Sequence, residues 1–144
     1  MFGTDRGQMR RYFCEVWARH LRGEPLDALA GLVAAVVADH PEYHMLLDKG
    51  EAIIEAEFPP EAGRTNPFLH MGMHLAIREQ VGTNRPNGIA RAHQGLAAAI
   101  GAHQAEHRIM DCLGESLWNA QRSGQAPDET AYLDCVQRLL GRNA

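Results

Sequence analysis

The chain has 144 residues, of which 45% are hydrophobic and 22% charged, and its formal net charge is -4. This balance is typical of one globular domain and excludes a disordered chain, while the slight acidity excludes a field that attracts nucleic acid or anionic lipid. No apolar run reaches the roughly 18 residues of a membrane span, and the N-terminal residues lack the apolar stretch of a signal peptide. We therefore expect one cytoplasmic domain over residues 1–144 that binds neither nucleic acid nor membrane.

Helical periodicity dominates the first half of the chain. The first predicted helix follows capping side chains at Thr4 and Asp5 and ends near Arg22. The second covers residues 26–39 and is apolar nearly all round, so it should be central. A proline at the first helical position predicts a short helix over residues 41–48.

The remaining segments are also separated by turn signals. Residues 51–57 are expected to form one or two helical turns, and residues 58–66, with two prolines and a glycine, are the clearest predicted loop. Asn66 as cap and Pro67 as first residue predict the start of the next helix. The second half is expected to hold helices at residues 67–80, 89–100, 102–122 and 130–140. The sequence thus predicts an all-α fold, a compact helical bundle of five to seven helices.

The three cysteines, Cys14, Cys112 and Cys135, are far apart in the sequence. No CxxC or CxxCH motif occurs, which argues against a disulfide framework, a zinc ribbon and covalently attached c-type haem. We interpret the cysteines as buried thiols that act as small hydrophobic side chains.

Six of the eight histidines form three His-x-x-x-His pairs, whereas chance placement gives roughly 0.4 pairs at this spacing. Residues four apart on a helix share a face, so both imidazoles of a pair can reach one ion. Successive pairs are about one helix and one turn apart, a step that can bring them together between packed helices. The pairs are His40/His44, His70/His74 and His103/His107.

Carboxylates follow the same helical lines. Asp111 continues the line of the last pair and Glu115 extends it, whereas Asp48, Glu79 and Glu106 are equally well explained as solvated charges. Histidines with one or two carboxylates are the ligands of iron, manganese and zinc sites in helical bundles. The predicted metal ligands are therefore His40, His44, His70, His74, His103, His107 and Asp111.

This pattern supports two hypotheses of different classes. The first is a non-haem site for a divalent metal, iron, manganese or zinc, with oxygen-related chemistry if the ion keeps an open position. The second is a non-catalytic interaction or adaptor bundle in which the histidines only pack. No HExxH, GxSxG or phosphate-binding loop occurs, and no catalytic residue is indicated.

Methionines interleave with the central pair, as in His70-Met71-Gly72-Met73-His74. Thioether and imidazole together suit copper(I) or an axial pair on haem. Methionine at helical spacing more often fills a core, so copper or haem binding is the less favoured interpretation.

A family of short proteobacterial proteins, catalogued only as a domain of unknown function, is similar to this chain in HPEYH (40–44), GRTNPFLHMGMHLAIREQ (63–80), AEHRIMDCLGESLWNAQRSG (105–124) and the opening MFGTDR. The resemblance covers nearly the whole chain, and TNPFLHMGMH is its most specific part. It implies a cytoplasmic bacterial protein of one domain and supplies no activity. The histidine pairing also resembles haemerythrin, whose iron ligands are histidines and carboxylates on bundle helices, in ligand type and helical spacing alone.

Overall fold

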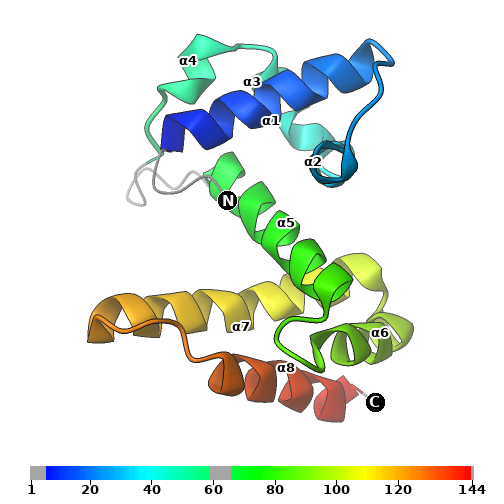
Figure 1. Cartoon of the computed structure of the whole chain (residues 1–144), viewed down its shortest axis with the longest axis vertical. Coiled ribbons are helices and arrows are strands. Elements are labelled where there is room, and N and C mark those ends of the chain that lie inside the picture. Colours follow the sequence, from blue (N-terminus) through cyan, green and yellow to red (C-terminus); the bar gives the residue numbers. More distant parts are fainter. Residues whose placement is uncertain (1–5, 59–65, 144) are drawn as a thin grey trace. The chain divides into compact units, whose positions relative to one another are not determined.

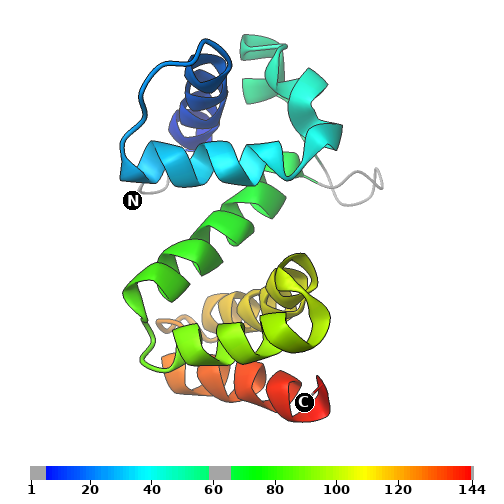
Figure 2. The same ribbon diagram turned by 90° about the vertical axis from the view of Figure 1, so that its right-hand side faces the viewer.

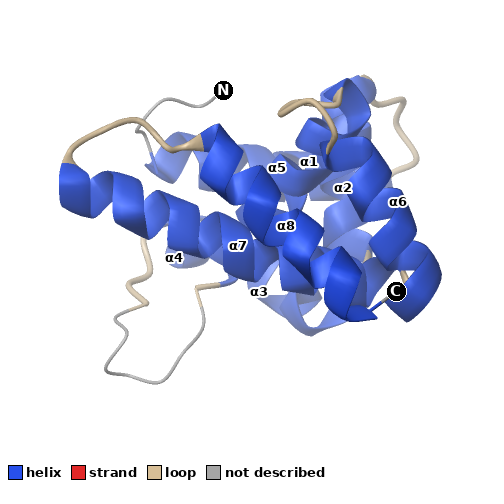
Figure 3. Ribbon diagram, turned by 90° about the horizontal axis from the view of Figure 1, so that it is seen from below, coloured by secondary structure: helices blue, strands red, loops and turns tan. Residues whose placement is uncertain are grey.

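The computed structural model describes residues 6–58 and 66–143. Over these ranges the chain forms eight α-helices and one 3-10 helix and contains no strand, so the predicted all-α class is confirmed (Figure 3). The helices outnumber the predicted five to seven because residues 41–54 form three pieces of only three or four residues each. The predicted caps Thr4 and Asp5, and most of the predicted loop, lie outside the described residues. No helix in the described ranges is both long enough and apolar enough to cross a membrane.

Backbone contacts divide the chain into two compact units, Met1–Leu75 (unit 1) and Ala76–Ala144 (unit 2). The division falls inside helix α5 (Pro67–Thr83), which contributes its first half to unit 1 and its second half to unit 2. The single domain over residues 1–144 stays a prediction.

Unit 1 is built around helix α1 (Arg6–Leu21), which contacts three of the elements that follow it (Figures 1 and 2). Those elements and the connecting 3-10 helix are α2 (Ala28–Ala38), η1 (Pro41–Tyr43), α3 (His44–Leu47) and α4 (Glu51–Ile54). The core of this unit consists of apolar side chains from all five α-helices, with the largest share from α1, α2 and the first turns of α5. They include Phe13, Val16, Val33, Val37, Leu47, Ile53, Phe68 and Met71.

Two helix starts in unit 1 are set by side-chain caps. The Asp27 carboxylate accepts a hydrogen bond from the Ala30 amide at 2.8 Å, so α2 begins two residues later than predicted. The Asn66 side-chain oxygen accepts from the amides of Phe68 and Leu69 at 3.0 and 3.2 Å, which confirms the predicted start of α5.

Arg10 is a buried charge in the core of unit 1, with 1% of its surface exposed. Its Nη1 atom donates to the carbonyl oxygens of Ile54 and Ala56, both at 2.8 Å. Its guanidinium lies over the rings of Phe58 and Phe68, at 5.4 and 5.0 Å from their centroids. Arg10 thus connects helix α1 to the last residue of α4 and to the segment that follows it.

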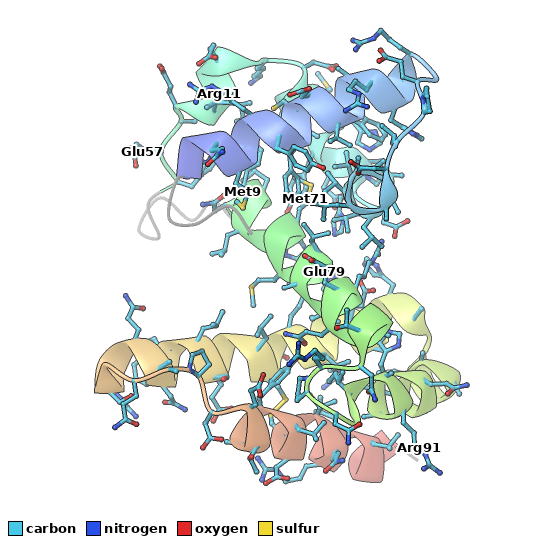
Figure 4. The ribbon with its side chains drawn as sticks, in the orientation of Figure 1. Met9, Arg11, Glu57, Met71, Glu79 and Arg91 are labelled. Carbon is cyan, nitrogen blue, oxygen red and sulfur yellow. A yellow bond between two sulfur atoms is a disulfide. The ribbon has the colours of Figure 1, made fainter. Side chains whose placement is uncertain are left out.

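Met9 and Met71 are labelled in Figure 4 where α1 faces α5. Met71 is fully buried in the core, and Met9 packs against that core from α1. A Cβ atom added at Gly72 would meet the Met9 sulfur at 4.0 Å, which is ordinary van der Waals contact. These two methionines therefore serve as core filling, the role that methionine at helical spacing usually has.

Unit 2 contains α6 (Ile89–Ile100), α7 (Ala102–Ser123) and α8 (Glu129–Asn143), each of which contacts the other two (Figures 1 and 2). Gly101 and Gly124 end α6 and α7 with φ angles of 91° and 70°, a backbone region that glycine adopts without strain. The buried side chains of these helices include Ile89, Leu96, Ile109, Leu113 and Val136.

The cysteine prediction is wrong for two of the three residues. Cys112 on α7 and Cys135 on α8 form a disulfide, with their Cα atoms 5.8 Å apart, and Cys14 is a free, half-buried thiol. The packing of α7 against α8 brings together two residues that are 23 apart in the sequence, and no short cysteine motif signals such a pair.

Tyr132 on α8 is the most strongly perturbed tyrosine among the described residues. Its hydroxyl donates to Gln80 Oε1 at 2.6 Å, and burial raises its pKa from 10.0 to about 12. The folded protein therefore keeps the phenol neutral in a range of pH where an unfolded chain ionises it.

The stability of unit 2 should consequently fall in alkaline solution. The contribution of the neutral phenol is fully present below about pH 10 and is lost as the pH rises towards 12, because the unfolded state then releases a proton that the folded state retains. Denaturant titrations on both sides of pH 10 should show a smaller alkaline loss in Tyr132→Phe than in the wild type. An equal loss in both proteins would contradict this assignment.

Candidate metal centre

His40 lies at the end of α2, where the chain leaves the helix. Its backbone has φ -126° and ψ 66°, since a residue before proline is kept out of the helical region. The side chain turns back one helical turn, and its Nδ1 lies 2.7 Å from the carbonyl oxygen of Val36. A carbonyl oxygen only accepts, so Nδ1 carries the hydrogen and the neutral ring has its lone pair on Nε2.

His70 and His74 lie one turn apart on α5, with ring centroids 4.9 Å apart. The His40 ring lies 5.1 Å from the His70 ring and 4.6 Å from the His74 ring. Each of the three residues offers a ligand nitrogen within 4.8 Å of those of the other two. These three residues of unit 1, His40, His70 and His74, are called the three-histidine centre below.

The three-histidine centre is shielded from solvent. His74 is completely buried, His40 is 2% exposed, and His70 is half-buried. Tyr43 covers one side, because its ring stacks on that of His40 at 5.7 Å and meets that of His70 at 6.1 Å. Burial, with a smaller contribution from Glu42, raises the pKa of Tyr43, so this neighbour is a neutral phenol near pH 7.

His44 does not join the three-histidine centre. Its Nε2 donates to the carbonyl oxygen of Val37 at 2.8 Å, and its ring lies against Trp17 with the centroids 4.5 Å apart. The spacing of four residues fails here because Pro41 begins a 3-10 turn and His40 is not helical. The two histidines therefore do not share one helix face.

The remaining predicted ligands lie on α7, in unit 2. The rings of His103 and His107 are 4.3 Å apart, as expected for residues four apart on a helix. His103 and Asp111 are exposed, and His107 is half-buried. The role of these three residues as ligands stays a prediction that rests on their spacing.

A family model described as a domain of unknown function, DUF1841, matches residues 5–138. The chain belongs to the DUF1841 family. No curated protein and no solved structure matches it. The expected membership of a family of unknown function is confirmed.

The carboxylates of the DUF1841 chain are arranged differently from the histidines. Glu106 is buried and forms a two-pronged ion pair with Arg78, at 2.9 and 3.2 Å, so its oxygens already have a cation. Asp48 and Glu115 are exposed, and Glu79 is half-buried on α5. The metal-ligand grouping found among the described residues consists of histidines alone.

Proposed function

We propose that this protein binds a divalent transition-metal ion, held in unit 1 by the three-histidine centre. The observation that carries the proposal is the hydrogen bond from His40 Nδ1 to the Val36 carbonyl oxygen. A backbone carbonyl that fixes the tautomer and ring orientation of a histidine is the usual outer-shell partner of a metal-ligating imidazole. It leaves Nε2 as the ligand atom, beside two histidines whose spacing on α5 allows them to share an ion.

The chemistry of the ligands selects among metals. Imidazole suits zinc, iron and copper, whereas manganese prefers sites rich in carboxylate, and the three-histidine centre contains none. Zinc or iron is therefore the proposed ion. Met71, the thioether that would favour copper(I), belongs to the apolar core.

An ion with three protein ligands keeps a position for water or another small ligand. A bound metal supplies Lewis acidity and lowers the pKa of such a water, and iron would add oxygen-related chemistry. Within the protein, burial of His74 and the stacked ring of Tyr43 restrict access of bulk water to this position.

The proposal predicts metal in protein purified without a polyhistidine tag. After growth with added zinc and iron, elemental analysis should find about one equivalent of zinc or iron per chain. Because the ligands come from separate elements of unit 1, the bound ion should also stabilise the fold. Saturating metal should raise the melting temperature, because an ion at 100 times its Kd stabilises the folded state by about 2.7 kcal/mol. A chelator should reverse the shift, and acidification should weaken binding, because an imidazole must be unprotonated to coordinate the ion.

The alternative is an interaction or adaptor bundle with a packed histidine core. It predicts negligible metal in the same preparation and identical melting curves with metal and with chelator. That pair of results would overturn the proposed function.

A further inference from the structure

A groove runs between α7 and α8 in unit 2. At one end is a cavity of about 90 Å³ lined by Cys112, Cys135 and Arg138, and the adjoining cavity of about 300 Å³ extends to the turn before α8. The two cavities share the lining residues Ser116, Asn119 and Ala131, so they adjoin each other. We refer to the two together as the α7–α8 groove, and the disulfide forms part of its wall.

The two sulfur-bearing residues differ in exposure. Cys112 is 2% exposed, whereas Cys135 is half-buried and reaches the surface of the groove. Thiol–disulfide exchange requires a thiolate to reach one sulfur of the pair, so access decides which sulfur is attacked. Cys135 is therefore the sulfur that an incoming thiolate reaches first, and Cys112 is the sulfur that leaves.

Charges of both signs line the α7–α8 groove. Arg138 stands near the disulfide, and Arg122 at the far end is held over the Trp118 ring at 4.4 Å and donates to Asn119 Oδ1 at 3.2 Å. Asp128 and Glu115 supply negative charge in the two cavities. Each cavity thus has one arginine and one carboxylate in its lining, which match a short peptide that carries carboxylates and an ammonium group.

We propose that the α7–α8 groove binds a small peptidic thiol, which exchanges with the disulfide at Cys135. The thiolate of the ligand attacks Cys135 Sγ, the bond between the two cysteines breaks, and its electron pair leaves on Cys112 Sγ, which takes a proton from water. The product is a mixed disulfide at Cys135. A second thiolate then attacks the ligand sulfur and releases Cys135 as a thiolate. In total two thiols are oxidised to one disulfide, and the protein disulfide is reduced by two electrons.

The test uses the full chain with Cys14→Ser, so that the half-buried free thiol cannot contribute. The oxidised protein is mixed with reduced glutathione, a tripeptide thiol with two carboxylates and one ammonium group, and quenched with acid at successive times. Peptide mass spectrometry should locate the adduct on Cys135. An adduct mainly on Cys112, or the absence of any adduct while the disulfide persists, would overturn the proposal, as would two free cysteines after purification without reductant.

Recognition is tested separately from reactivity. Arg122→Gln and Arg138→Gln should each slow exchange with glutathione by about fivefold, the effect of an exposed ion pair, and leave exchange with uncharged 2-mercaptoethanol unchanged. Arg91→Gln, at an exposed position on α6 outside the groove, is the matched control (Figure 4). Arg138→Lys, which keeps the charge, should retain most of the glutathione rate if Arg138→Gln proves unstable. If every variant exchanges with glutathione at the wild-type rate, and likewise with 2-mercaptoethanol, the groove does not recognise the peptide.

Discussion

His74→Ala is expected to abolish binding of zinc or iron, and His40→Ala and His70→Ala to weaken it severely. Each side chain would provide one of the three nitrogen ligands proposed for the three-histidine centre, and the loss of one would leave two. Loss of a mere outer-shell partner costs 10- to 100-fold in metal affinity, so loss of a ligand should exceed about 100-fold. The double variant of His70 and His74 should bind hardly less than either single variant, because ligands of one ion act as a unit. Calorimetric titration with each metal measures these affinities.

The matched controls are His20→Ala and His93→Ala. His20 is exposed on α1 with its ring stacked on Trp17, and His93 is half-buried on α6, so both variants should bind metal as the wild type does. The sequence pairing also predicts weaker binding for His107→Ala. If His74→Ala binds metal as tightly as His20→Ala, His93→Ala and His107→Ala do, the three-histidine centre is contradicted. If the wild type contains no metal and His74→Ala is nevertheless less stable, a packed polar core is favoured.

Arg10→Met is expected to lower the free energy of unfolding by about 3 kcal/mol or more. The change removes the donor for two carbonyl oxygens, Ile54 and Ala56, and an unsatisfied buried acceptor costs roughly 1–3 kcal/mol. The cationic contact with two aromatic rings is lost as well. Denaturant unfolding monitored by circular dichroism measures the change.

Arg11→Ala, one residue away, is the control for that substitution. Its side chain is exposed and pairs with Glu51 across 3.4 Å, an interaction worth at most about 1 kcal/mol. Similar losses for both variants would show that the buried position of Arg10 has no special role in holding unit 1 together.

The sequence predicted those elements whose ends depend on local backbone chemistry. The range predicted for α6, residues 89–100, is the observed one, because glycines at both ends adopt positive φ angles. The start of α5 follows from the Asn66 cap and from Pro67. Between residues 41 and 54 local signals conflict, since Pro41 starts a 3-10 turn and Gly50, with φ 60°, interrupts the chain again. Packing against α1 decides the conformation there.

The candidate site was predictable only where the spacing rule applies. His70 and His74 are four apart within one helix and do face the same way, as predicted. His40 reaches them for another reason, because its ring is turned by the bond to the Val36 carbonyl. His44 is diverted to Trp17. A rule for helical neighbours gives no information on a residue whose backbone has already left the helix.

Contacts between distant segments gave no signal in the sequence. Arg10 donates to residues 44 and 46 positions away, and the two joined cysteines are 23 positions apart. An arginine near the start of an amphipathic helix is usually solvated, and the two carbonyl acceptors together with the aromatic rings around Arg10 make its burial possible. Pairings of this kind are decided by how helices pack, which spacing along one helix does not describe.

The two tryptophans of the chain give each unit its own optical probe. Trp17, in unit 1, is 6% exposed and lies between the imidazole rings of His20 and His44, whereas Trp118, in unit 2, is 58% exposed beneath the Arg122 guanidinium. An indole shielded from water emits at shorter wavelength than one in contact with it. The blue edge of the emission spectrum therefore reports unit 1 and the red edge reports unit 2, so the melting of each half can be followed in the same cuvette without an attached label.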